Sequence, residues 1–140
     1  CLCDSINYVL SRKKVKQTFK NIYEALKYNG TFIFDVDSLY KMDKILDGYF
    51  EEEDADDFYF KWEAKKTAFG KIEHLIEIID KENNEHIKEL HQQQTYSIET
   101  YYEMLQQAGF KEIEHYGEFE KYHDKSQRII FVCRKRRDGK

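Results

Sequence analysis

The stretch LKYNGTFIFDVD, residues 26–37, decides the fold of this chain because it joins the end of a helix to a buried strand. Apolar residues spaced for one helical face predict a helix over residues 12–28, which the pair Asn29-Gly30 ends in a left-handed turn. TFIFDVD (31–37) lacks the alternation of a surface strand and predicts a strand covered on both faces. Since the chain begins with an apparent strand end, the pattern predicts a parallel, right-handed β-α-β crossover.

The next part of the chain predicts a second, antiparallel unit. Ser38 caps a short amphipathic helix, and the acidic run 51–57 is typical of a solvated loop. Beyond it come three β-like segments with Gly70 and Asn83-Asn84 at the turns between them, which favours a meander. The three segments are 58–69, 71–82 and 86–97.

The last third returns to α/β patterning. Ser97 caps a helix that Gly109 ends. Residues 111–118 alternate charged and apolar side chains, as an edge strand does, whereas 128–133 is almost continuously apolar and predicts an interior strand. The basic tail 134–140 has no hydrophobic partner and is expected to fray.

Composition restricts the class of protein. The 140 residues suit one domain, and 36% charged with 41% hydrophobic residues is typical of a globular chain. No run approaches the roughly 20 apolar residues of a membrane helix, and no signal peptide is apparent, so a cytoplasmic protein without a membrane partner is expected. The net charge of -4 gives no general attraction to nucleic acid. The chain opens at Cys1 without a methionine, which predicts the later part of a longer protein.

Several common chemistries lack their motifs. The five histidines and three cysteines lie scattered, without the paired spacing of a metal site, so no metal is expected and the thiols are expected to be reduced. No Walker lysine loop is present, and the six glycines are not clustered. A chain without a glycine-rich turn cannot let its backbone approach a nucleotide closely, so the main cradle of any cofactor is expected elsewhere.

One candidate site follows the first strand end. Asp4, Ser5, Asn7 and Tyr8 lie in the turn after it, where open α/β sheets place their ligands. Polar groups in such a place cost folding energy unless they cap a helix or meet a ligand. The same residue types also serve as ordinary caps and turn residues, and this alternative stays open.

A second candidate site lies in the last β-like segment. Glu89, His91 and Gln93 alternate onto one strand face and are followed by Tyr96, which places a carboxylate, a titratable imidazole and an amide in a row. The solvated face of a meander would show the same pattern. The sequence therefore leaves both interpretations open.

The order of these elements, together with particular residues, resembles a known family. The chain carries CDSINY (3–8), LKYNGTFIFDV (26–36), E-x-H-x-Q-x-x-Y-S (89–97), QAGF (107–110) and RIIFVCRK (128–135). This combination resembles the C-terminal portion of class I S-adenosylmethionine-dependent methyltransferases, in the bacterial small-molecule-type branch whose members carry D-S-x-N-Y after strand four. The resemblance spans nearly the whole chain.

The resemblance implies an α/β fold, an incomplete Rossmann-like methyltransferase sheet of strands 4, 5, 7 and 6 with strand seven antiparallel, in a single domain of residues 1–140. The inserted three-stranded antiparallel meander, 58–97, would cover the substrate cleft. Strands one to three, with the glycine-rich loop that holds the cofactor, have no counterpart, so S-adenosylmethionine is expected to bind this chain weakly or not at all. The implied strands are four, ending at Leu2 and Cys3, five at 31–37, six at 111–118 and seven at 128–134.

The resemblance also implies a reaction, the transfer of a methyl group from the cofactor to an oxygen, nitrogen or carbon atom of a small-molecule substrate. His91 or Glu89 would orient or deprotonate the acceptor, and the residues after strand four would position it. The predicted catalytic residues are His91, Glu89 and Asp4, the predicted substrate-binding residues are Ser5, Asn7, Tyr8, Gln93 and Tyr96, and the predicted cofactor contacts are Cys3 and Asp4.

A non-catalytic module is the alternative interpretation. The cleft under the meander would then hold a ligand or a partner chain without chemistry. In either case, an unprotected edge at strand four predicts pairing with a second copy, as a homodimer or a larger homo-oligomer.

Overall fold

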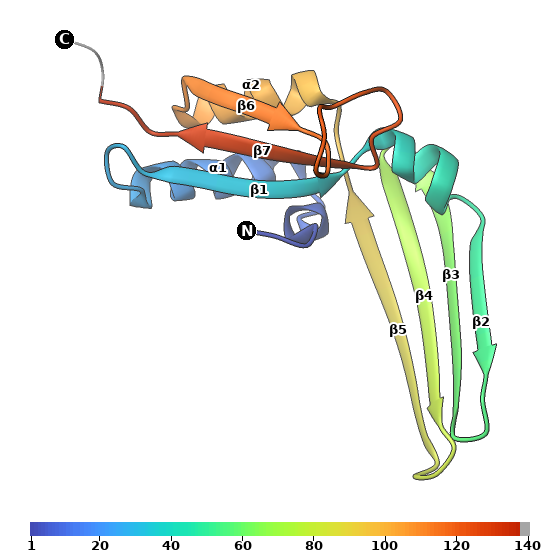
Figure 1. Ribbon diagram of the computed structural model, residues 1–140. Coiled ribbons are helices and arrows are strands. Elements are labelled where there is room, and N and C mark those ends of the chain that lie inside the picture. The colour runs from blue at the N-terminus through green and yellow to red at the C-terminus, as the bar shows by residue number, and fades with distance from the viewer. Residues whose placement is uncertain (138–140) are drawn as a thin grey trace.

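The computed structural model describes residues 1–137 as a bent molecule with two parts (Figure 1). An α/β body contains the N-terminus, and a long antiparallel sheet projects from one end of it. The chain leaves the body after strand β1 (Thr31–Asp37) and returns to it at helix α2 (Ile98–Ala108). The segment that leaves the body and the segment that returns to it lie side by side, because the Thr95 hydroxyl donates to the carbonyl of Asp37 at 2.6 Å.

The body is a three-stranded sheet with two helices on one face (Figure 1). Its strand order is β1-β7-β6, and both pairs are antiparallel. Strand β7 (Arg128–Arg134) is interior and β6 (Glu112–Tyr116) is an edge, as the sequence predicts. This is the order five, seven, six with an antiparallel strand seven that the methyltransferase resemblance implies.

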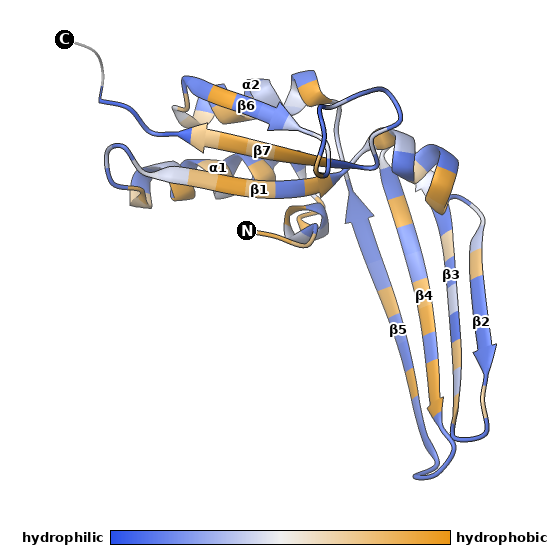
Figure 2. Ribbon diagram, viewed as in Figure 1, coloured by the Kyte–Doolittle hydropathy of each residue, from blue (hydrophilic) through white to orange (hydrophobic). Residues whose placement is uncertain are grey.

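Aromatic side chains fill the space between this sheet and the helices. Phe34 of β1 stacks on Phe131 of β7 with ring centroids 4.9 Å apart, and Phe19 of helix α1 (Arg12–Ala25) lies 5.1 Å from Phe34. Tyr101 of α2 is fully buried beside them. Hydrophobic residues are accordingly prominent along β1 and β7 in Figure 2. Buried aromatic area therefore dominates the stability of the body.

The projecting sheet has four antiparallel strands in the order β2-β3-β4-β5. Their bounds are Tyr49–Asp54 for β2, Phe58–Ala68 for β3, Lys71–Asp80 for β4 and Glu85–Gln94 for β5. A π-helical turn, Lys41–Leu46 (η2), links β1 to the sheet and buries Met42 and Leu46 against Ala64 and Ile72. This small second core anchors the base of the sheet.

The acidic run is not simply a loop, and the meander has four strands rather than the three expected. Residues 49–54 form β2, which pairs with β3 so that Glu52 lies opposite Lys61. The carboxylates of β2 are exposed on an edge strand, where charge is well tolerated, and the opposite charge across the ladder offsets their repulsion. Residues 49–54 are a strand because they pair with β3, and a run of like charges gives no indication of such a partner.

The first residues form no strand, so the predicted end of strand four is wrong as an element. Leu2, 62% exposed, and Cys3 are on the surface, and a 3-10 helix (η1, Ser5–Tyr8) follows them. The segment still touches β1, because the amino group of Cys1 donates to the carbonyl of Ile33 at 2.9 Å. The parallel β-α-β crossover is therefore incomplete, since its first strand makes no ladder.

Two expectations about exposure also differ from the structure. Strand β1 is covered on both faces only in its second half, since Ile33 is 44% exposed whereas Asp35 and Asp37 on the same face are buried. The tail does not fray at once, because Lys135 Nζ donates to the carbonyls of Tyr23 and Leu26 near the C-terminal end of α1. Residues 138–140 of that predicted tail lie outside the described residues. Within residues 1–137, no helix combines the length and the apolar character needed to cross a membrane.

Candidate functional site

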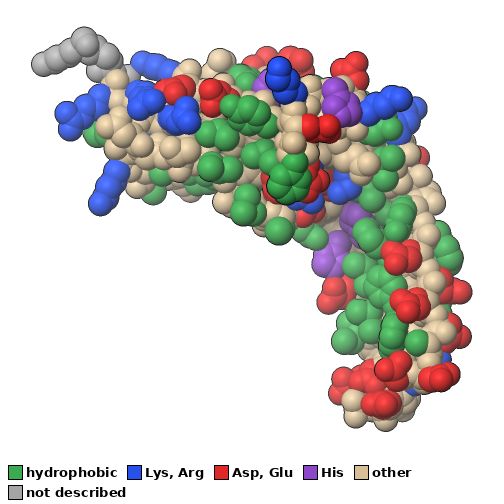
Figure 3. All heavy atoms as spheres, viewed as in Figure 1, with side chains coloured by type: hydrophobic (Ala, Val, Ile, Leu, Met, Phe, Trp, Pro, Cys, Tyr) green, Lys and Arg blue, Asp and Glu red, His purple; other side chains and the backbone are tan. Residues whose placement is uncertain are grey.

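The two predicted constellations meet at the corner between the body and the projecting sheet. Asp4 and Tyr8 approach from η1, while His91 and Gln93 approach from β5. A cavity of about 240 Å³ lies between them, and its remaining lining comes from β1, η2, β3, β4 and β7. Figure 3 shows histidine and hydrophobic side chains on the inner side of this corner.

Asn7 ties η1 to the segments on both sides of the cavity. Its side chain is fully buried, its Nδ2 donates to the carbonyl of Gln94 at 2.9 Å, and its Oδ1 accepts from the amide of Asp37 at 2.9 Å. Buried hydrogen bonds of this kind are costly to leave unmade. Asn7 therefore joins β1 to the end of β5 behind the residues that line the cavity, and so stabilises the shape of the cavity.

His91 joins Tyr8 to Glu89 in a short hydrogen-bonded chain. Its Nε2 lies 2.7 Å from Glu89 Oε2, and its Nδ1 lies 3.0 Å from the Tyr8 hydroxyl. Because an ionised carboxylate only accepts, Nε2 carries the proton and Nδ1 accepts from Tyr8. Burial, followed by three nearby carboxylates, raises the pKa of Tyr8, so the phenol is protonated at neutral pH. His91 is therefore placed to receive a proton that passes through Tyr8.

Gln93 and His74 hold the Asp4 carboxylate from the other side of the cavity. Gln93 Nε2 donates to Asp4 Oδ2 at 2.6 Å, and Gln93 Oε1 lies 2.9 Å from His74 Nε2. Trp62 Nε1 donates to His74 Nδ1 at 3.0 Å. Burial is the main cause that lowers the pKa of His74 and keeps the ring neutral. These contacts involve Oδ2 of Asp4 and not Oδ1, so Oδ1 can accept a further hydrogen bond.

Two ion pairs complete the charged wall of the cavity. Lys41 Nζ donates to Asp37 Oδ1 at 2.9 Å, and Arg128 Nη1 donates to Asp35 Oδ2 at 2.7 Å. Asp35 Oδ1 also accepts from the backbone amide of Asp4 at 2.7 Å. Burial raises the pKa of Asp37, while the Lys41 ammonium acts in the opposite direction. Asp35 lies behind the lining, so the cavity itself is lined by two carboxylates, Asp4 and Asp37, and two cations, Lys41 and Arg128.

Two sequence relatives carry the same description. The Geobacillus sp. (strain WCH70) protein named "Putative methyltransferase" is 39% identical over 140 residues, an alignment that covers 95% of this chain and 56% of that protein. The Bacillus subtilis protein named "Putative methyltransferase YqeM" is 33% identical over 117 residues, which covers 78% of this chain and 45% of that protein. No family model matches the chain.

A solved structure agrees with these relatives. The crystal structure of an S-adenosylmethionine-dependent methyltransferase from Clostridium acetobutylicum matches with a TM-score of 0.88 and 23% identity, over 98% of this chain and 57% of that one. The chain is part of a methyltransferase. It spans about half the length of the curated relatives that it matches. The family resemblance and the incomplete Rossmann-like fold are thus confirmed, and these comparisons do not favour a non-catalytic module.

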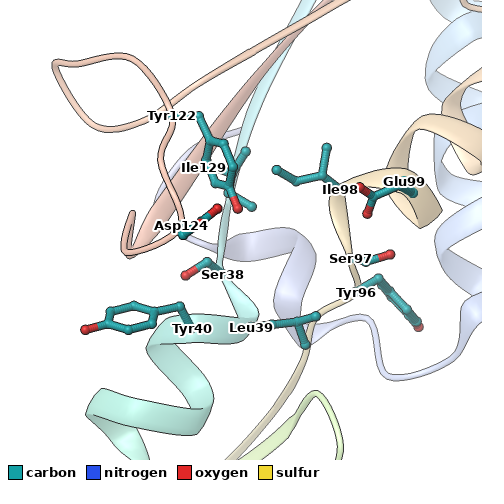
Figure 4. Close-up of a pocket in the computed structure, with 10 residues that line it drawn as sticks. All are labelled: Ser38, Leu39, Tyr40, Tyr96, Ser97, Ile98, Glu99, Tyr122, Asp124 and Ile129. Atoms are coloured by element: carbon teal, nitrogen blue, oxygen red, sulfur yellow. The ribbon is translucent and has the colours of Figure 1, made fainter.

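Five predicted site residues are not part of the cavity lining. Two of them, Asn7 and Glu89, form hydrogen bonds with Asp37 and His91 of the lining, and the other three, Ser5, Cys3 and Tyr96, lie elsewhere. Ser5 is exposed, and its hydroxyl donates to the carbonyl of Leu2, as an ordinary turn residue does. Cys3 is also exposed. Tyr96 lines a separate pocket of about 360 Å³ at the start of α2 (Figure 4). Ser5, Cys3 and Tyr96 were predicted because they are close in sequence to residues of the cavity. Their positions in the structure do not support the predicted roles.

Seven residues that line the cavity were not predicted, namely the aliphatic Leu46 and Ile76 and the polar or aromatic Asp37, Lys41, Trp62, His74 and Arg128. A signal existed for Asp37, because a carboxylate that ends a buried strand reaches the edge of the sheet where ligands bind. A signal also existed for His74, which lies directly opposite His91 when the β4–β5 register is counted from the turn. No local pattern pointed to Lys41, Trp62 or Arg128.

The burial of His74 predicts a pH-dependent stability. Its folded pKa lies below the ordinary 6.5, so below that pH the unfolded state binds more protons and the folded state loses stability as the pH falls. Urea unfolding at about pH 7.5 and about pH 5.5 should show a larger loss for the wild type than for His74→Gln, which cannot titrate. The raised pKa of Asp37 acts with the opposite sign in both proteins and cancels. Equal losses in the two proteins would contradict the prediction.

Proposed function

We propose that this chain forms the acceptor-binding side of the active site in an S-adenosylmethionine-dependent methyltransferase that modifies a small molecule. The observation that carries the proposal is the corner cavity, where the Asp4 carboxylate and the Tyr8–His91 pair converge. These groups come from segments more than 80 residues apart in the chain. The description of the Clostridium structure as S-adenosylmethionine-dependent supports the choice of cofactor.

The residues present fit one end of that cofactor. S-adenosylmethionine, when bound, supplies an electrophilic methyl group on a positively charged sulfur. Asp4 and Asp37 face the cavity, but Asp37 is paired with Lys41, so Asp4, which is held by the neutral amide of Gln93, is the carboxylate that would stabilise the cation. The glycines of residues 1–137 do not form a glycine-rich turn between a strand and a helix, so the nucleoside part of the cofactor needs a cradle from elsewhere.

The chain's own side chains would bind and deprotonate the acceptor. Asp4 accepts a hydrogen bond from an N–H or O–H of the substrate other than the one whose proton is removed, and so orients the acceptor in a cavity that holds only a small group. As the acceptor gives its proton to the Tyr8 oxygen, the Tyr8 hydroxyl proton passes to His91 Nδ1. The resulting imidazolium is stabilised by Glu89, whose carboxylate lies 2.7 Å from Nε2. Glu89 thus acts through His91 and is a positioning residue.

Calorimetric titration with S-adenosylmethionine tests this proposal at the cofactor. Because this chain holds only the methyl end of the cofactor, the 140-residue chain should give no saturable heat, whereas the full-length protein should bind. Saturable binding by the 140-residue chain, or its absence from the full-length protein, would refute the division of the site that we propose. A matched titration of buffer into each protein supplies the baseline.

Two further proposals concern assembly and location. Strand β1 pairs with β7 on one side, while its other edge accepts the hydrogen bond from Cys1. An edge of this kind favours pairing with a second copy, so a homo-oligomer of the isolated chain stays our prediction. A cytoplasmic location also stays a prediction.

A further inference from the structure

A chain of hydrogen bonds runs through the base of the projecting sheet to Asp4. It starts at the indole of Trp62 on β3, passes through His74 on β4 and Gln93 on β5, and ends at the Asp4 carboxylate. The successive donor–acceptor distances are 3.0, 2.9 and 2.6 Å. Its first three members therefore come from three neighbouring strands.

The chemistry of the two ends determines the direction of this chain. An indole N–H can only donate, so His74 Nδ1 accepts and the ring proton sits on Nε2. That Nε2–H donates to Gln93 Oε1, which leaves the Gln93 amide group to donate to Asp4. An ionised carboxylate only accepts, so the last link agrees with the first. No other assignment of protons satisfies all three contacts.

Burial makes this arrangement hard to change. His74 and Gln93 are both buried, and an unsatisfied polar group in such a place costs about 1–3 kcal/mol. Flipping the imidazole or the amide would break two links at once. The last donor is therefore held against Oδ2 of Asp4, which fixes the carboxylate of a residue that lines the cavity.

We propose that Trp62, His74 and Gln93 are positioning residues that hold the Asp4 carboxylate as a fixed acceptor for an N–H or O–H group of the methylated substrate. This inference rests on the proposed function and narrows it. A substrate oriented by a hydrogen bond that it donates to Asp4 carries an N–H or O–H group, as amines and alcohols do, and a molecule without such a donor is excluded.

A matched pair of variants at His74 separates this chain from simple packing. His74→Gln keeps an acceptor for Trp62 and a donor for Gln93, whereas His74→Met has comparable bulk and neither group. The probe is methylammonium chloride, a small N–H donor, titrated into the full-length protein. The side-chain amide resonances of Gln93 report its binding by NMR.

We expect the wild type and His74→Gln to bind the probe within about threefold of each other, and His74→Met to bind about tenfold more weakly. Nitrogen-15 NMR of the probe-free wild type should show His74 as the neutral Nε2–H tautomer. Trp62→Phe, which keeps an aromatic ring and removes the N–H, supplies a second test and should weaken binding about threefold.

The inference would be overturned by equal affinities in all of these proteins. It would also be overturned if His74→Gln bound the probe as weakly as His74→Met, or if NMR showed His74 as the Nδ1–H tautomer. Absence of probe binding to the wild type would do the same. None of these measurements uses methyl transfer, so a failure of the proposed function, seen as a protein that transfers no methyl group, is a separate result.

Discussion

His91→Ala in the full-length protein should lower methyl transfer by about 10²-fold or more and leave the affinity for S-adenosylmethionine unchanged. The imidazole bridges Tyr8 and Glu89 at 3.0 and 2.7 Å, so its removal takes away the group that receives the acceptor proton. The carboxylates of Asp4 and Asp37, which line the same cavity, stay in place. Transfer of tritiated methyl groups to a panel of small amines and alcohols measures turnover, and calorimetry measures the affinity.

His86→Ala is the matched control for that variant. His86 lies on the same strand, but it is exposed on the opposite face of the sheet and pairs with Glu77 at 3.1 Å. Its loss should leave turnover within about twofold, since it touches nothing in the cavity. Normal turnover by His91→Ala with every accepted substrate would show that His91 is not the base. Asp4 or a water molecule would then be the better candidate.

Phe34→Ala should lower the free energy of unfolding by about 3–5 kcal/mol, the range for deletion of a buried aromatic ring. Phe34 is fully buried, and four rings surround it, those of Phe19, Phe32, Phe131 and Tyr101 at 5.1, 5.0, 4.9 and 6.2 Å between centroids. Their strands and helix are held by other contacts, so the space left by the ring cannot close fully. Urea unfolding of the full-length protein measures the change.

Ile33→Ala supplies the control for the core variant. Ile33 is the residue before Phe34 in β1, and its side chain is 44% exposed on the opposite face of the strand. A surface truncation of this kind usually changes stability by no more than about 0.5 kcal/mol, and we expect a loss near that value. Similar losses for both variants would mean that the helices do not bury the Phe34 face as the structure shows.

Most elements of the body could be predicted from the sequence because their signals are local. Ser97 accepts a hydrogen bond from the amide of Thr100, and Gly109 ends α2 with a φ of 119°, so both helix boundaries depend on residues within one turn. The apolar runs 31–37 and 128–134 likewise identify their strands. Spacing and capping act over a few residues, and a single sequence displays them directly.

Strand β2 and the first residues could not be predicted in the same way. Glu51 to Glu53 form a strand because β3 offers them a ladder, and nothing within the run itself indicates that partner. Leu2 and Cys3 have apolar character, yet their place beside β1 is marked by one hydrogen bond from Cys1. Strand formation depends on a partner elsewhere in the chain, which the local pattern does not contain.

The sequence by itself determined the helices, most of the strands and two polar groupings, one containing Asp4 and Tyr8 and the other His91 and Gln93. Only the tertiary structure decided that these groupings face one cavity, that His74 and Trp62 join them, and that other nearby polar residues turn away. The bond between Gln93 and Asp4 joins residues 89 positions apart. Such a contact depends on how η1, β1 and the projecting sheet pack together, and that packing is a property of the whole chain rather than of any short segment.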